Sequence, residues 1–131
     1  MHVKILGLLL LLLLSACAGE VYDGAYTASG DGFEEKDLRK DEQFTATDDL
    51  NIVVKLNKHD DPVIVMARFI DPNGDILQEV ETEAASNVGT AILGVDYEAR
   101  TDTANQWVVG RYRVDIFVDD QRVDTVYFRV D

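Results

Sequence analysis

A chain of 131 residues is long enough for a single domain, and its 12 basic and 25 acidic residues give it a net charge of −13. This charge argues against nucleic acid as a partner, because binding to phosphates requires lysine or arginine side chains that displace counterions. The chain has one cysteine and cannot form an internal disulfide, so an apolar core has to hold the domain together.

The N-terminus carries a short apolar run after a single lysine, Lys4. The run covers residues 5–14 and is almost entirely leucine. It is too short to cross a bilayer as a helix, which takes about 20 residues, but its length is typical of the hydrophobic region of a signal peptide. Next comes Leu14-Ser15-Ala16-Cys17, which resembles the lipobox of bacterial lipoproteins: a branched apolar residue, two small residues and a cysteine.

This resemblance implies that residues 1–16 are a signal peptide and that the thiol of Cys17 takes a diacylglyceryl group. Acyl chains would then hold the protein on a membrane, since each buried methylene contributes about 0.8 kcal/mol. In a diderm bacterium the resemblance also implies the outer membrane, facing the periplasm, because Ala18 stands where aspartate retains lipoproteins in the inner membrane. The alternative is an ordinary secretory signal cleaved near Ala16 or Ala18, with Cys17 incidental.

Small and polar residues follow the cysteine, and residues 17–32 show no sustained apolar period. We expect this stretch to be the lipidated N-terminus and a flexible tether, with an edge strand around Val21, Tyr22 and Tyr26 as the alternative. Residues 33–43 are dense in charge and could form a helical turn, but they lack a wide apolar face. The folded domain is therefore expected to cover residues 33–131.

Apolar and polar residues alternate from Phe44 onward, as they do in half-buried strands. Residues 63–70 are almost continuously apolar, which predicts a central strand buried on both faces. Turn residues separate the segments, for example DPNGD at residues 71–75. The expected strands cover residues 50–56, 63–70, 76–83, 88–98, 111–118 and 126–130. This pattern predicts an all-β, antiparallel sandwich of six or seven strands.

The C-terminal part of the chain contains WVVGRYRV at residues 107–114, a turn at residues 119–120 and FRV at residues 128–130. This succession resembles the last hairpin of immunoglobulin-like sandwiches in bacterial envelope proteins, including macroglobulin-type domains. The resemblance implies a single antiparallel immunoglobulin-like β-sandwich in which Trp107, Gly110 and Tyr112 are corner and core residues. The alternative for Trp107 is a platform for a ligand.

Residues suited to catalysis are scarce after the signal peptide. His59 is the one histidine there and lies in a polar turn, where we expect it to be solvated. Ser29 and Ser86 are the only serines, and neither lies in a nucleophile-elbow sequence. Paired carboxylates could support glycoside hydrolysis, but 25 acidic residues produce such pairs by chance. We therefore expect a protein that is not an enzyme and has no cofactor.

One segment has the spacing of a metal-binding loop. Asp71, Asn73 and Asp75 place side-chain oxygens at positions 1, 3 and 5, as a calcium loop does. The sixth position is Ile76 instead of glycine, however, and the twelfth is Thr82 instead of glutamate. A hairpin turn is therefore the better interpretation, and calcium binding is the alternative.

Three acidic residues, Glu79, Glu81 and Glu83, alternate along one expected strand and therefore share a face. Removal of the signal peptide leaves 11 basic and 25 acidic residues, a net charge of −14, which would attract a basic partner to this face. The acidic surface could also serve solubility alone.

The expected function is that of an envelope-anchored, non-catalytic domain that binds a protein partner or supports an envelope assembly. Its membrane contact would be made through the N-terminal lipid. One alternative is an inhibitor of a basic envelope-targeting enzyme, and another is a small-ligand or calcium-binding module.

Overall fold

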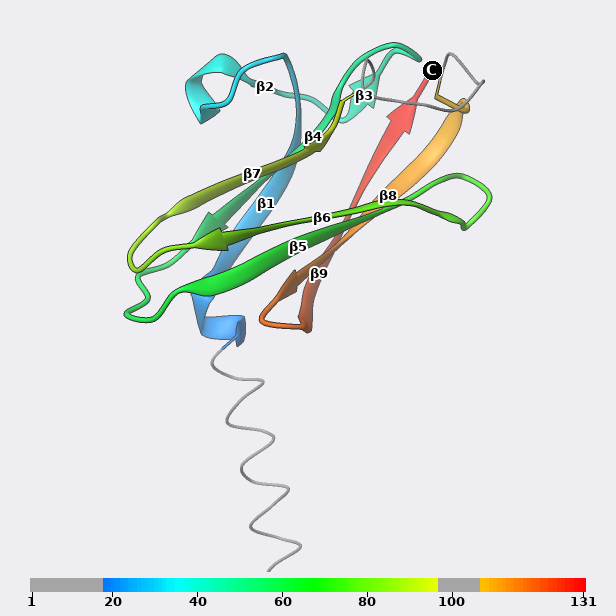
Figure 1. The fold of residues 1–131 in the computed structure, drawn as a ribbon. Coiled ribbons are helices and arrows are strands. Elements are labelled where there is room, and N and C mark those ends of the chain that lie inside the picture. The colour runs from blue at the N-terminus through cyan, green and yellow to red at the C-terminus, as the bar shows by residue number, and fades with distance from the viewer. Residues whose placement is uncertain (1–17, 97–106) are drawn as a thin grey trace, which may run out of the picture.

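The computed structural model describes residues 18–96 and 107–131, and these residues form two packed β-sheets (Figure 1). One sheet has the strand order β2-β1-β4-β7 and the other has the order β3-β9-β8-β5-β6. A short 3-10 helix, η1 (Glu35–Asp37), precedes β2. The strands are β1 (Tyr22–Ser29), β2 (Arg39–Lys40), β3 (Gln43–Phe44), β4 (Leu50–Leu56), β5 (Val63–Ile70), β6 (Ile76–Ala84), β7 (Thr90–Val95), β8 (Gly110–Val118) and β9 (Gln121–Val130).

The core lies between the two sheets and is built from residues of alternating position. In β4, Leu50, Ile52 and Val54 are fully buried, and in β8, Val114 and Ile116 are as well. Alternation places such side chains on one face of each strand, so two strands of this kind bury their apolar faces against each other. The predicted all-β sandwich of two sheets is confirmed, and its pairings are antiparallel as predicted except that the short β3 pairs with β9 in parallel.

An aromatic corner secures the β8–β9 hairpin. The hydroxyl of Tyr112 donates to the carbonyl of Val108 at 2.6 Å, and the Tyr112 ring stacks on Phe128 with 5.1 Å between centroids. The indole N–H of Trp107 donates to the carbonyl of Asp48 at 2.6 Å. Trp107 and Tyr112 expose only 3% and 1% of their surface, which confirms that both are core residues.

The hairpin turn is tight and follows the sequence signal. Asp119 and Asp120 have positive φ angles of 46° and 67°, the conformation that a two-residue turn requires to match the twist of the strands. At the other end of β8, Gly110 has φ 143°, and a Cβ atom there would lie 2.9 Å from the ring of Pro72. Glycine is therefore required at Gly110 by both conformation and space.

The tether predicted for residues 17–32 is wrong over half of its length, because Tyr22–Ser29 form β1 within a sheet. The alternative of an edge strand around Tyr22 and Tyr26 is closer to the structure, because β1 pairs with β4 along its length while the short β2 reaches only Ala28 and Ser29 on the other side. The sequence of β1 shows no clear apolar alternation, because the strand packs through small residues such as Ala28 and Thr27, both of which are buried. The folded domain thus begins well before residue 33, and its described strands number nine, more than the six or seven expected.

Strand β5 is also less enclosed than its composition predicts. Val65, Ala67 and Phe69 are fully buried, but Ile64 is 37% exposed and Arg68 is partly exposed. Only one face of β5 meets the other sheet, while the opposite face carries Ile64, Met66 and Arg68 toward solvent. The prediction that both faces are buried is therefore wrong, and the outer face of this sheet carries apolar side chains.

A polar contact joins the two sheets where β1 and β9 approach each other. The hydroxyl of Tyr22 donates to the carboxylate of Asp124 at 2.5 Å. Burial and the neighbouring carboxylate raise the pKa of Tyr22, so the phenol stays protonated as a donor. This bond closes the seam between β1 in one sheet and β9 in the other.

Candidate functional site

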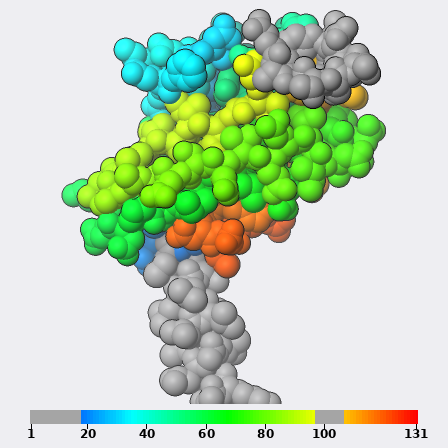
Figure 2. Space-filling model, in the orientation of Figure 1, coloured from blue at the N-terminus to red at the C-terminus, as the bar shows by residue number. Residues whose placement is uncertain are grey.

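The three glutamates lie on β6, at the edge of the five-stranded sheet. Glu79, Glu81 and Glu83 are exposed and project from the same face, opposite Arg68, Met66 and Ile64 of β5. Figure 2 shows the light-green residues of β6 crossing the face turned toward the viewer, with no other segment over them. The structure therefore brings the predicted docking residues together on an open surface.

One of these glutamates already has a basic partner. The guanidinium of Arg68 lies 3.3 Å from the carboxylate of Glu79, its direct cross-strand neighbour. No ion pair within the described residues involves Glu81 or Glu83. The row therefore presents two available carboxylates and one that is neutralised.

Arginine and aromatic side chains cover the neighbouring part of this outer face. The guanidinium of Arg68 lies 4.9 Å from the ring centroid of Phe117, and that of Arg111 lies 4.1 Å from the ring centroid of Tyr127. Arg113 contacts the buried carboxylate of Asp115 at 3.5 Å. Arginine, aromatic residues and methionine are the residue types enriched in protein interfaces. Sequence analysis missed this surface because its members come from three strands whose order the sequence does not show.

A shallow hollow of about 360 Å³ lies at one end of this face. Tyr127, which is 49% exposed, and Arg111 form part of its lining. A larger hollow of about 600 Å³ lies between the end of β1 and the loop that joins β3 to β4, and is lined by Ser29, Gly30, Asp31, Arg39, Thr47, Asp48, Asp49 and Asp96.

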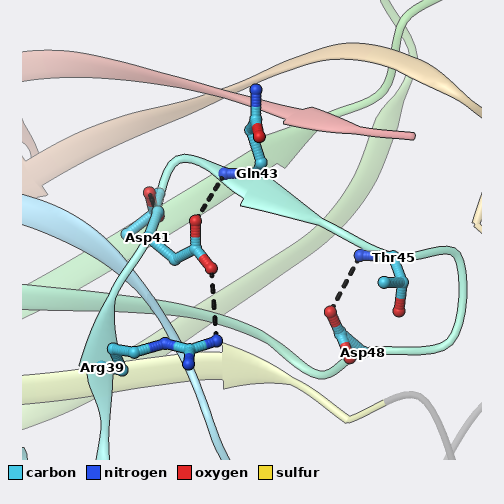
Figure 3. Close-up of polar contacts among 6 residues, drawn as sticks. Arg39, Asp41, Gln43, Thr45 and Asp48 are labelled. Carbon is cyan, nitrogen blue, oxygen red and sulfur yellow. Dashed lines mark hydrogen bonds and ion pairs between the residues drawn. The ribbon is translucent and has the colours of Figure 1, made fainter.

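Carboxylates near the larger hollow are engaged in local structure. In Figure 3, Asp41 accepts a hydrogen bond from the backbone N–H of Gln43 at 3.0 Å and lies 3.7 Å from Arg39. Asp48 accepts from the backbone N–H of Thr45 at 2.8 Å. Over residues 18–96 and 107–131, no group of three or more His, Cys, Asp or Glu side chains is placed to hold a metal ion.

The calcium-like segment is a hairpin turn between β5 and β6. One carboxylate oxygen of Asp71 accepts hydrogen bonds from the backbone N–H groups of Asn73 and Asp75, at 2.9 and 3.0 Å. Gly74 has φ 87° and donates its N–H to the carbonyl of Asp71. The carboxylate that would head a calcium loop therefore organises the turn, as the hairpin interpretation predicts.

His59 departs from its expected place in solvent. It is 6% exposed, with Nδ1 2.8 Å from the carbonyl of Asp61 and Nε2 2.9 Å from the carbonyl of Val88. Two carbonyl acceptors are satisfied together only when both ring nitrogens carry hydrogen. These two hydrogen bonds raise the pKa of His59, and burial opposes the shift. Through these hydrogen bonds His59 connects the loop before β5 to the loop before β7.

Cys17, the predicted lipidation site, and the apolar run before it lie outside the described residues. Within the described part of the chain, no helix has the length and apolar character needed to traverse a bilayer.

Comparison with known proteins identifies the fold. No protein-family model matches the chain, and no match was found among curated proteins. Among solved structures, the chain is similar to an immunoglobulin-like protein from Pseudomonas aeruginosa, with a TM-score of 0.55 and 12% identity over 86% of this chain and 95% of that one. At this identity the likeness concerns the fold alone, which is immunoglobulin-like.

Two further structures are similar at lower TM-scores. The alkylpurine DNA glycosylase AlkC of Pseudomonas fluorescens, bound to DNA containing an abasic site analog, gives 0.47 at 13% identity over 68% of this chain and 27% of that one. The CARDB domain of a Pyrococcus furiosus protein, in complex with di-metal ions, gives 0.42 at 12% identity over 86% and 90%. Neither likeness is close enough to inform function.

Proposed function

We propose that this chain is a lipid-anchored envelope protein whose non-catalytic immunoglobulin-like domain binds a protein partner. The anchor rests on Leu14-Ser15-Ala16-Cys17, where the chain's one cysteine occupies the lipobox position. In a diderm organism Ala18 favours the outer membrane. The anchor would keep the domain at the membrane surface, where its binding surface meets partners of the envelope.

The observation that carries the binding role is the outer face of the five-stranded sheet. Ile64 and Met66 supply apolar surface there, Arg68 lies over Phe117, and Arg111 lies over Tyr127. Stacking on Tyr127 by its face leaves the N–H groups at the edge of the Arg111 guanidinium able to donate to a partner, whereas Nε and Nη2 of Arg68 already donate to Glu79. A surface of arginine, aromatic and apolar side chains supports recognition of a protein.

The anchor is tested by cell fractionation and mass spectrometry of the mature N-terminus. Cys17→Ser is expected to move the domain from the membrane fraction to the soluble fraction, and the wild-type N-terminus is expected to carry acyl chains. An unmodified N-terminus in membrane-associated wild type would refute the lipid anchor.

The binding surface is tested by site-specific crosslinking in cells. A photo-crosslinking residue at position 66, in place of Met66, is expected to give a discrete protein adduct. The matched control replaces Ile92 of β7, which is also half-buried but belongs to the other sheet. Equal adducts from both positions, or none from position 66, would refute the outer face as the binding surface.

A further inference from the structure

The direction in which the N–H and C=O groups of β6 point can be deduced from a contact between β5 and the end of β8, on the side of β5 away from β6. The N–H of Asp119 donates to the carbonyl of Ile64 at 2.9 Å, and the N–H of Ile64 donates to the carboxylate of Asp119 at 2.8 Å. The backbone groups of Ile64 therefore point toward β8. Because these groups alternate along a strand, those of Val63, Val65 and Ala67 point the other way, toward β6.

The pairing of β5 with β6 then fixes which residues of β6 are bonded. Val63, Val65 and Ala67 lie opposite Ala84, Thr82 and Val80, so these three positions of β6 use their backbone groups in the ladder. Glu79, Glu81 and Glu83 consequently turn their N–H and C=O groups away from β5. In the sheet order of the described residues no strand follows β6 on that side.

This edge is long and regular. β6 has nine residues without proline or lysine, and its pairing irregularity lies at its beginning, beside Phe69 and Ile70. Native proteins usually blunt such an edge with proline, lysine, a bulge or a covering element, because it offers a template for another strand. Over Glu79–Glu83 the strand has no proline, lysine or bulge, although β7 of the other sheet lies close to β6. The row of negative charge there repels acidic strands and admits basic ones.

The acidic row also disfavours pairing of β6 with β6 of a second copy. Such pairing sets glutamates beside glutamates, and like charges on neighbouring strands are destabilising. By contrast, the contact between Arg68 and Glu79 within the sheet shows the favoured arrangement: a basic side chain on the neighbouring strand, directly opposite a glutamate.

We propose that β6 binds an extended segment of a partner protein as an added strand, with lysine or arginine at alternate positions opposite Glu81 and Glu83. Cross-strand neighbours on one face are about 4.5–5.5 Å apart, within reach of an ion pair. Side chains two positions apart repeat at roughly 6.8 Å on both strands, so alternate basic residues match alternate glutamates. The inference rests on the proposed protein-binding function and names the chemistry of the partner.

The probe is a synthetic decapeptide that alternates lysine with threonine and valine, and the control is a peptide of the same composition with its lysines clustered at one end. Binding to the isotope-labelled domain, residues 18–131, is followed by NMR hydrogen exchange. The alternating peptide is expected to protect the amides of Glu79, Glu81 and Glu83. The amides of Val80 and Thr82, already bonded to β5, are expected to change little.

Two variants separate the charges from the backbone. Glu81→Gln with Glu83→Gln is expected to weaken the alternating peptide roughly three- to tenfold, the effect of two exposed ion pairs. Glu20→Gln with Glu42→Gln removes the same charge elsewhere and is expected to have little effect. Glu81→Pro deletes an outward N–H without touching the bonds to β5, and is expected to abolish the protection pattern.

The inference is overturned if both peptides bind equally, if protection appears away from the three glutamates, or if Glu81→Pro binds like Glu81→Gln. It is also overturned if sedimentation shows a dimer of the domain that the peptide dissociates, since the edge would then belong to a second copy. Persistence of the adduct at position 66 after such a result would leave protein binding by the outer face intact.

Discussion

The two edges of the five-stranded sheet differ in what lies beside them. At one edge β3 pairs with β9, and the seam beyond it is closed by the bond from Tyr22 to Asp124. At the other edge β6 carries exposed glutamates whose backbone groups face away from β5. The first edge is held at its two ends, by the pairing of β3 with Arg129 and Val130 and by the bond to Asp124, whereas the second edge carries a row of exposed charge. From this contrast we expect the largest losses of stability at the β8–β9 corner and little loss at β6, where the proposed added strand would bind.

The largest effect is expected from breaking the aromatic corner on the secured side. Tyr112→Ala should lower the free energy of unfolding by about 3–5 kcal/mol, because it removes a fully buried ring from between Val108 and Phe128. Tyr112→Phe keeps the stack and should cost only about 1 kcal/mol for the lost hydroxyl. Chemical denaturation measures both, and an unchanged midpoint for Tyr112→Ala would contradict the assignment.

The seam should be the next most sensitive feature. Tyr22→Phe deletes the hydroxyl that Asp124 accepts from and is expected to cost about 1–2 kcal/mol. Tyr127→Phe is the matched control, because Tyr127 lies on the exposed outer face and should change stability little. Equal losses in the two variants would show that the seam bond has no special role.

His59 should make stability depend on pH. Its pKa is raised in the folded state, so its contribution is fully present below the unfolded value of about 6.5 and is lost as pH rises through the folded value. The stability difference between wild type and His59→Asn should therefore shrink as pH rises from 5 to 9. Urea unfolding across this pH range measures the stability difference, and a difference that grows with pH would contradict the predicted direction.

The smallest effect on stability is expected at the open edge. Replacing Glu79, Glu81 and Glu83 by glutamine should change the free energy of unfolding by less than about 0.5 kcal/mol, since exposed charges contribute little. The same change should slow association with a basic partner and weaken its dependence on salt. Stopped-flow association rates at low and high salt test this. Rates that change neither with salt nor with the substitutions would show that the three glutamates form only a solvated surface.

The secured side was largely predictable from sequence because its signals are local. Tyr112 and the turn at Asp119 and Asp120 act within a few residues of the chain, and the structure has them as predicted. β3 was not predictable in the same way, since two residues carry no period and their pairing with β9 spans most of the chain. The burial of His59 depends likewise on Val88, which the sequence places far away.

The acidic row was predictable as a pattern, but its place at an edge was not. Alternation shows that Glu79, Glu81 and Glu83 share a face, which the structure confirms. Long-range pairing decides which strands flank β6, and the alternation of residues along a strand carries no information about it. The direction of the backbone groups in β6 likewise had to be traced through the contact between Ile64 and Asp119.

The buried corner also gives the protein an internal optical reporter. Trp107 is the chain's single tryptophan, and its backbone and indole N–H groups donate to Ala46 and Asp48 in the loop between β3 and β4. Its emission should shift to longer wavelength when this corner separates and water reaches the indole. β6 contains no aromatic residue, so a peptide arriving there is optically silent. Unfolding can therefore be followed by fluorescence in the unlabelled chain while a ligand is titrated onto the opposite edge.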